Sequence, residues 1–170
     1  MLALDIPVLT AGQFDLLTVT GQAEVGGELA LTPGDDLPMY QPTEIVQAAS
    51  VIGQFATVSG GVLDSETGLA VTYSPTAVDV QRALLGDLTL DGSIDYMDLG
   101  ILATNYGRSG VSWSEGDVGG NGLVDYTDLG MLATNYGEVF HPSPGAVPEP
   151  AFAILLGAGA LGLLRRRRQR

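Results

Sequence analysis

The fold of the second half of this chain is decided by two matching stretches. They read GDLTLDGSIDYMDLGILATNYG at residues 86–107 and GDVGGNGLVDYTDLGMLATNYG at residues 116–137. Asp87 in the first stretch corresponds to Asp117 in the second, thirty positions later. Self-similarity at a fixed period indicates a repeated structural unit and not a bias of composition. We therefore expect both stretches to fold in the same way.

The first half of each stretch has the spacing of a calcium-binding loop. A hard cation takes about six to eight oxygens, which a loop of about twelve residues supplies from its first, third, fifth, seventh, ninth and twelfth positions, the seventh through its carbonyl. In the first loop these are Asp87, Thr89, Asp91, Ser93 (carbonyl), Asp95 and Asp98, with Gly92 at the sharp turn. In the second loop they are Asp117, Asn121, Leu123 (carbonyl), Asp125 and Asp128, with Gly122 at the turn. The sequence predicts two Ca²⁺ sites.

The two loops are predicted to differ in affinity. Gly119 stands at the third position of the second loop and offers no side-chain ligand, and Asn121 lacks the charge of Asp91. The second loop should therefore bind calcium more weakly. In the first loop, the acidic side chains repel one another by about 1 kcal/mol or more per pair without a cation. We expect that loop to be loose until metal binds.

An alternative reading treats these stretches as turns in which Asp98 and Asp128 only cap helices. Helical spacing does follow each loop. The apolar residues with this spacing are Leu99, Leu102, Ala103 and Tyr106, and then Leu129, Leu132, Ala133 and Tyr136. Gly107 and Gly137 are placed to end the two helices. Duplication in full register favours the metal-binding reading over capping alone.

The two D-x-x-x-[DN]-G-x-[IV]-D-Y-x-D-L runs resemble a type I dockerin. This resemblance implies a small all-α module at residues 86–137, with two antiparallel loop-helix units that bind a cohesin domain. Dockerins commonly carry small hydroxylic residues just after the ninth loop position, where this chain has Tyr96-Met97 and Tyr126-Thr127. The partner is therefore left open between a cohesin-like protein and the β region of the same chain. Trp113, between the repeats, is expected to be a packing or rim residue and not a sugar-binding platform.

Residues 1–80 have strand patterning. The alternating runs LLTVT (16–20), ELALT (28–32) and LAVTY (69–73) are separated by glycine pairs. This region resembles the closing rungs of β-helical, autotransporter-like passenger regions, which implies a β-solenoid. Residues 1–10 have no basic segment and do not read as a signal peptide. Together with an export tail, this predicts that a further N-terminal part precedes the β region.

The C-terminal part consists of a Pro/Gly-rich linker at residues 138–146 and a tail at residues 147–170. The tail joins a Pro-Glu-Pro motif, an apolar stretch at 151–164 and an arginine cluster. These motif residues are Val147, Pro148, Glu149 and Pro150, and Arg165, Arg166, Arg167 and Arg168. The tail resembles the PEP-CTERM sorting signal, which implies recognition by an exosortase and cleavage. The alternative is a simple membrane anchor.

The apolar stretch 151–164 is expected to form a single hydrophobic helix. Such a helix spans only about 21 Å, short of the roughly 30 Å hydrocarbon core. It therefore suits transient membrane insertion, with the arginines on the cytoplasmic side. The predicted destination of the protein is the cell envelope, its outer surface or the extracellular matrix.

Charge and composition exclude several function classes. The formal net charge is −13, cysteine is absent, and only Arg82 and Arg108 are basic before the tail. So acidic a body disfavours a nucleic acid partner, and the single histidine, His141, lies in the linker. The sequence thus predicts a noncatalytic exported surface or matrix protein. The alternative is the C-terminal part of a dockerin-bearing, polysaccharide-degrading enzyme such as a glycoside hydrolase.

Overall fold

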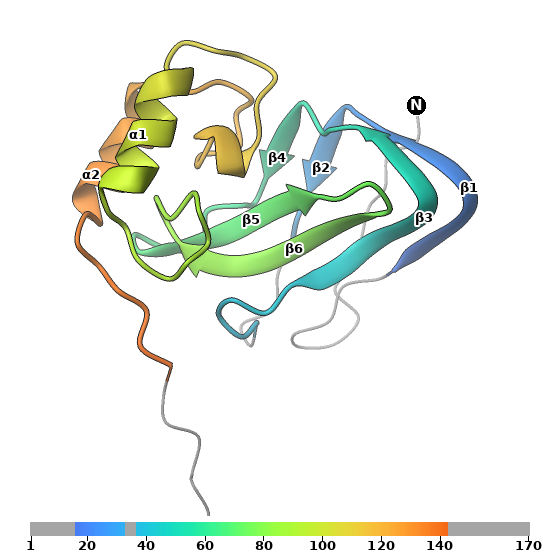
Figure 1. Cartoon of the computed structure of the whole chain (residues 1–170), viewed down its shortest axis with the longest axis horizontal. Coiled ribbons are helices and arrows are strands. Elements are labelled where there is room, and N and C mark those ends of the chain that lie inside the picture. The colour runs from blue at the N-terminus through green and yellow to red at the C-terminus, as the bar shows by residue number, and fades with distance from the viewer. Residues whose placement is uncertain (1–15, 33–36, 143–170) are drawn as a thin grey trace, which may run out of the picture. The chain divides into compact units, whose positions relative to one another are not determined.

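The computed structural model describes residues 16–32 and 37–142 (Figure 1). The strands in this part of the chain are β1 (Leu17–Val25), β2 (Glu28–Ala30), β3 (Thr43–Gly53), β4 (Thr57–Ser59), β5 (Thr67–Tyr73) and β6 (Ala77–Leu84). They are followed by helix α1 (Tyr96–Asn105), the 3-10 turn η1 (Trp113–Glu115) and helix α2 (Tyr126–Thr134). The compact unit that contains these elements ends at Phe140.

The first four strands form two successive coils. β1 pairs with β3 in parallel, with Leu17 opposite Val46, and β2 pairs with β4 in parallel, with Glu28 opposite Thr57. Both pairs have the same separation along the chain, as expected when one coil stacks on the next. The predicted β-rich region is confirmed, and its first part contains two parallel strand pairs.

The chain then leaves the coil path and forms a hairpin, so the predicted β-solenoid does not continue through the described residues. β6 pairs antiparallel with both β3 and β5, which gives a four-stranded sheet in the order β1-β3-β6-β5. The turn before β6 is closed on both sides: the N–H of Ser74 donates to the carbonyl of Ala77, and the N–H of Ala77 donates to Ser74 Oγ, each at 2.9 Å. This closed turn reverses the chain within a few residues.

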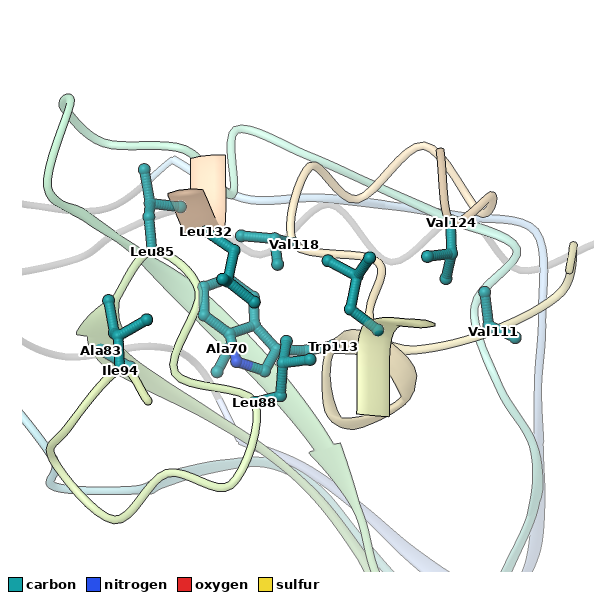
Figure 2. Packing of buried hydrophobic residues seen from close by; sticks show 11 residues of the cluster. Ala70, Ala83, Leu85, Leu88, Ile94, Val111, Trp113, Val118, Val124 and Leu132 are labelled. Carbon is teal, nitrogen blue, oxygen red and sulfur yellow. The ribbon is translucent and has the colours of Figure 1, made fainter. Parts of the chain in front are cut away.

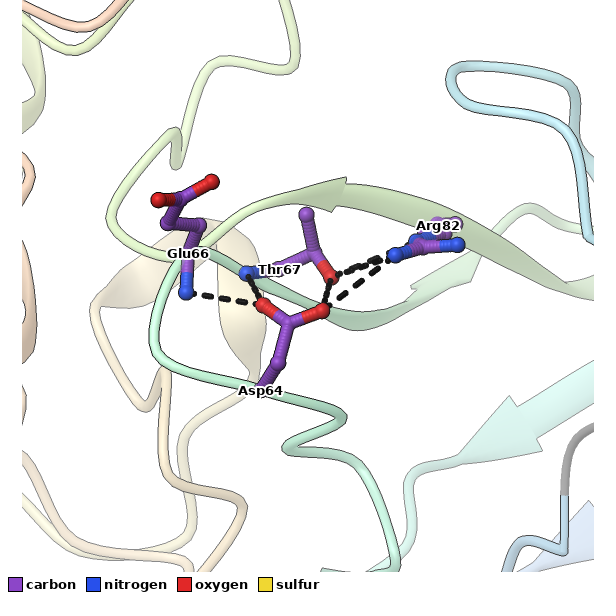
Figure 3. Close-up of polar contacts among 4 residues, drawn as sticks. All are labelled: Asp64, Glu66, Thr67 and Arg82. Carbon is purple, nitrogen blue, oxygen red and sulfur yellow. Dashed lines mark hydrogen bonds and ion pairs between the residues drawn. The ribbon is translucent and has the colours of Figure 1, made fainter. Parts of the chain in front are cut away.

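A polar network holds the start of β5 against β6 (Figure 3). Asp64 accepts hydrogen bonds from the Thr67 hydroxyl and N–H, both at 2.7 Å, and from the Glu66 N–H at 2.8 Å. Arg82 of β6 contacts Asp64 at 3.3 Å and donates to the Thr67 hydroxyl. The Thr67 hydroxyl bond lowers the pKa of Asp64. These partners give Asp64 and Arg82 a structural role in the hairpin.

The β region and the repeats share a hydrophobic core (Figure 2). Ala70 of β5 and Ala83 of β6 are fully buried against residues of both repeats. The other buried members are Leu85, Leu88, Ile94, Leu102, Val111, Trp113, Val118, Val124 and Leu132. Trp113 is 5% exposed and lies within this cluster, so it is a packing residue as expected. The repeats therefore bury their apolar side chains with the help of the β strands.

The second acidic loop lies against β4. The N–H of Val58 donates to the carbonyl of Gly120 at 2.7 Å. Because β2 occupies one side of β4, this bond satisfies a group on the side that a further strand would otherwise use. The second repeat thus covers the edge of β4 that is not paired with β2. The sequence alone does not predict what covers this edge.

The predicted helices can be compared with the structure for the two repeats but not for the tail. The two predicted helices are present. The C-cap of α1 is Tyr106, so Gly107, with a φ angle of 81°, follows it directly as predicted, whereas the C-cap of α2 is Asn135, two residues before Gly137. In the residues that the structure describes, no helix is long and apolar enough to cross a membrane. The predicted hydrophobic helix at 151–164 and the sorting residues at 147–150 and 165–168 lie outside the described residues.

Candidate metal site in the duplicated loops

Each acidic loop is paired with the segment that follows the helix of the other repeat. The N–H of Ile94 donates to the carbonyl of Glu138 at 3.0 Å, and the N–H of Gly137 donates to the carbonyl of Ile94 at 2.9 Å. The corresponding bonds of the second loop join Val124 to Arg108 at 3.0 Å and to Gly107 at 2.8 Å. The repeats are therefore related by an approximate two-fold exchange, and neither loop is completed by its own repeat alone.

The first acid of each loop closes the loop on itself. Asp87 Oδ2 accepts the N–H of Gly92 at 2.8 Å, and Asp117 Oδ2 accepts the N–H of Gly122 at the same distance. The remaining oxygen of Asp87 accepts the N–H of Asp91 at 3.3 Å. In the second loop, Asp117 Oδ1 accepts the N–H of Asn121 at 3.0 Å. Both acids are buried, so the repeat places two equivalent carboxylates inside the protein.

The last acid of each loop reaches back across it. Asp98 Oδ1 accepts the N–H groups of Leu88 and Thr89 at 2.9 and 3.1 Å, and Asp98 Oδ2 accepts the N–H of Asp95 at 2.9 Å. Asp128 makes the corresponding bonds to Gly119 at 2.8 Å and to Asp125 at 2.9 Å. Asp98 and Asp128 therefore tie the beginning of each loop to its helix.

Helix capping accounts for part of this pattern. Asp95 and Asp125 are the N-cap residues of α1 and α2, and Asp98 and Asp128 complete a capping box in each helix. The capping alternative is therefore present in the structure. It does not use up the acids, because each carboxylate offers about four acceptor sites. Capping and cation binding are compatible at the same residues.

The fifth and seventh positions lie at the exposed side of each loop. Asp91 Oδ1 accepts the N–H and the hydroxyl of Ser93 at 2.9 and 2.7 Å, and the bond from the Ser93 hydroxyl is the main cause of the lowered pKa of Asp91. Asn121 Oδ1 accepts the N–H of Leu123 at 2.8 Å in the same way. Because the Gly92 and Ile94 carbonyls both accept bonds from the opposite segment, strand alternation turns the Ser93 carbonyl to the other side.

The structure brings some of the predicted ligands together and not others. Asp87 and Thr89 touch, with the Thr89 hydroxyl donating to Asp87 Oδ1 at 3.2 Å. Within residues 16–32 and 37–142, no three acidic or histidine side chains gather into a metal-binding group. The carboxylates are instead turned toward backbone N–H groups of the loop.

Burial changes the charge properties of the two first-position acids. It raises the pKa of Asp87, against the opposing effect of the Tyr40 hydroxyl bond. It also raises the pKa of Asp117 to about 6, and the nearby Asp128 adds to this increase. Negative charge at these two positions is therefore unfavourable in the folded protein without a positive partner.

We expect the metal-free protein to lose stability as the pH rises through about 6. The pKa of Asp117 is 3.8 ordinarily and about 6 in the folded state, so the folded protein holds this proton more tightly than the unfolded chain. The stabilising contribution is fully present below about pH 4 and is lost as the pH rises through about 6. The difference should amount to about 1–3 kcal/mol in urea unfolding with a chelator present. Asp117→Asn should reduce this pH dependence, and an unchanged dependence would contradict the prediction.

Two contacts to the first loop had no signal in the sequence. Tyr40 donates its hydroxyl to Asp87 Oδ2 at 2.7 Å, and Trp113 Nε1 donates to the Asp87 carbonyl at 2.8 Å. Both partners are remote from Asp87 along the chain, and neither belongs to the repeated pattern. The β region therefore contacts the predicted metal loop directly, which was one of the two partners left open.

Comparison with known proteins identifies one segment of this chain. Residues 146–168 match the PEP-CTERM protein-sorting motif, which confirms the predicted tail. This motif marks an exported protein that an exosortase sorts to the cell envelope or surface. No curated protein matches the chain, and no solved structure matches it.

Proposed function

We propose that this exported protein is a noncatalytic surface or matrix protein whose duplicated loops bind two calcium ions. The observation that carries the proposal is the duplication of the hydrogen-bond network around Asp87 and Asp117, with Asp98 and Asp128 in equivalent places. A network of this kind orients buried carboxylates without neutralising them. A bound cation would supply the missing positive charge.

The donor set fits a hard cation. Carboxylate, hydroxyl and carbonyl oxygens are the ligands that calcium prefers. The residues that would hold the first ion are Asp87, Thr89, Asp91, Ser93, Asp95 and Asp98. The residues that would hold the second are Asp117, Asn121, Leu123, Asp125 and Asp128. Binding requires the exposed acids to rotate toward the buried ones, which the exposure of Asp91 permits.

The proposed role of calcium is to fix the repeats to the β region. Asp87 already contacts Tyr40, and the second loop already contacts Val58. An ion in each loop would stiffen the two contacts at once and would hold the C-terminal part of the unit in place ahead of the sorting tail. In this view the repeats have an intramolecular partner and do not require a cohesin-like one. The stretch 151–164 would then hold the protein in the membrane transiently until the exosortase acts.

Calcium titration of the whole chain, followed by calorimetry and thermal unfolding, tests this proposal. The whole chain is required because the repeats share their core with β5 and β6. We expect two ions to bind, the second more weakly, and an ion at 100 times its dissociation constant to stabilise the fold by about 2.7 kcal/mol. The double variant Asp87→Ala, Asp117→Ala should lose both effects.

A matched control removes two negative charges elsewhere. Glu24→Gln and Glu28→Gln lie on the exposed surface of β1 and β2 and remove the same total charge. This variant should bind calcium as the wild type does. If millimolar calcium produces neither heat nor a shift of the unfolding temperature in the wild type, the calcium proposal is wrong.

A further inference from the structure

Tyr40 is held in an unusual backbone conformation next to the first loop. Its φ angle is 56°, a left-handed value that is uncommon for a bulky residue and persists only where surrounding contacts impose it. The Tyr40 N–H donates to the carbonyl of Arg82 at 2.8 Å, and its ring lies 4.9 Å from the ring of Phe140. The contacts therefore fix the ring between β6 and the segment that follows the second repeat.

The hydroxyl of Tyr40 joins the β region to the first acid of the loop. It accepts the N–H of Leu84 at 3.2 Å and donates to Asp87 Oδ2 at 2.7 Å. Because its one donor is directed at Asp87 while its oxygen accepts from the backbone, the orientation of the hydroxyl is defined. A neutral donor to a carboxylate gives a short, charge-assisted bond.

This bond makes the two oxygens of Asp87 unequal. Oδ2 has two short bonds, from Tyr40 and from Gly92 at 2.8 Å. Oδ1 has two long ones, from the Thr89 hydroxyl at 3.2 Å and the Asp91 N–H at 3.3 Å. The weakly bonded Oδ1 is therefore the oxygen that an ion can take. In the second loop, Asp117 accepts hydrogen bonds from backbone N–H groups of the loop itself.

We propose that Tyr40 is a positioning residue for the ion of the first loop, and that through it this loop is coupled to the β region. The inference rests on the proposed calcium binding. Tyr40 does not contact the ion; it holds Asp87 Oδ2 so that Oδ1 stays available. Partners of this kind, which orient a ligand, typically change metal affinity by about 10–100-fold when they are removed.

The coupling must act in both directions. If Tyr40 strengthens ion binding, the ion strengthens the contact of Tyr40 by the same factor. Calcium should therefore slow hydrogen exchange at the Tyr40 amide, which is bonded to Arg82 of β6. Ion binding in the first loop would then be coupled to the contact between Tyr40 and β6. Ion binding in the second loop would not be coupled to β6 through Tyr40.

Calcium calorimetry on the full chain with Tyr40→Phe tests the inference. Phenylalanine keeps the ring against Phe140 and removes only the hydroxyl. Asp117→Asn removes calcium binding by the second loop, so that the affinity of the first loop is measured alone. Asp87→Asn in the same way allows the affinity of the second loop to be measured alone. We expect Tyr40→Phe to weaken the first loop about ten-fold, to leave the second unchanged and to abolish the calcium effect on the Tyr40 amide.

Tyr73→Phe is the matched control. The Tyr73 hydroxyl also accepts a backbone N–H, that of Phe55 at 3.1 Å, and it lies away from the first loop. Its removal should leave the affinity of the first loop unchanged, and the control is read on that loop because, in addition to burial, Asp117 of the second loop contributes to the raised pKa of Tyr73. The inference is overturned if Tyr40→Phe behaves as Tyr73→Phe does, or if it weakens both loops equally. If the wild type binds no calcium at all, the proposed function fails, and this inference fails with it.

Discussion

Trp113→Ala is expected to destabilise the protein by about 3–5 kcal/mol, the range for removal of a buried tryptophan from a core. The ring belongs to the cluster that joins both repeats to β5 and β6. It also fills the space next to Gly68, where an added Cβ would come within 3.2 Å of the ring. Its loss therefore opens a cavity at the place where the β region and the repeats meet. Urea unfolding, monitored by far-UV circular dichroism, measures the change.

Trp113→Phe separates packing from hydrogen bonding at this site. Phenylalanine keeps part of the ring volume but cannot donate to the buried carbonyl of Asp87, which Trp113 Nε1 contacts at 2.8 Å. An unsatisfied buried acceptor costs about 1–3 kcal/mol. We expect this variant to lie between the wild type and Trp113→Ala. A loss below about 1 kcal/mol in Trp113→Ala would contradict the prediction.

The local structure of the repeats could be predicted from the sequence because short-range patterns control it. Gly92 and Gly122 take positive φ angles at the sharp turns, where glycine is favoured. Ile94 and Val124, at the eighth position of each loop, are both buried. Both helices begin at the tenth loop position, at Tyr96 and Tyr126, so the last acid of each loop lies in the first turn of its helix. Each of these features depends on residues within one repeat.

The arrangement of the repeats against the strands could not be predicted in the same way. The contacts of Asp87 with Tyr40 and of Gly120 with Val58 join residues far apart in the sequence. Nothing in composition or periodicity marks such pairs. The reversal at Ser74 was missed for a different reason, because each strand is predicted from its own alternation of apolar and polar residues. Alternation predicts that a strand forms but not which way its partner runs.

Two exposed tyrosines lie at the positions where the comparison with dockerins left the binding partner of the repeats undecided. Tyr96 and Tyr126 are 73% and 77% exposed, so the two equivalent helix starts face away from the core. The loops beside them face the β region instead. In each repeat the loop therefore contacts the β region, while the start of the helix is exposed. The intramolecular contact leaves the helix surface accessible.

Gly120→Ala is expected to destabilise the protein by about 2–4 kcal/mol, since it combines a strained left-handed conformation with a steric overlap. Gly120 has a φ angle of 74°, and an added Cβ would lie 2.3 Å from the carbonyl oxygen of Val58. Because that oxygen belongs to the backbone of β4, it cannot turn aside as a side chain can. The first repeat has Leu90 at the corresponding position, also with a positive φ angle. At this position of the repeat, glycine is thus required only in the second loop, which contacts the backbone of β4.

Gly130→Ala is the control for Gly120→Ala. Gly130 lies inside α2, and an added Cβ would meet nothing within 4 Å. Alanine is a better helix former than glycine by about 0.5–1 kcal/mol, so this variant should be slightly more stable than the wild type. The two substitutions therefore make the same chemical change with opposite expected signs, and urea unfolding of both variants measures the difference. If Gly120→Ala is as stable as Gly130→Ala, the second loop does not pack against β4 and does not cover its edge.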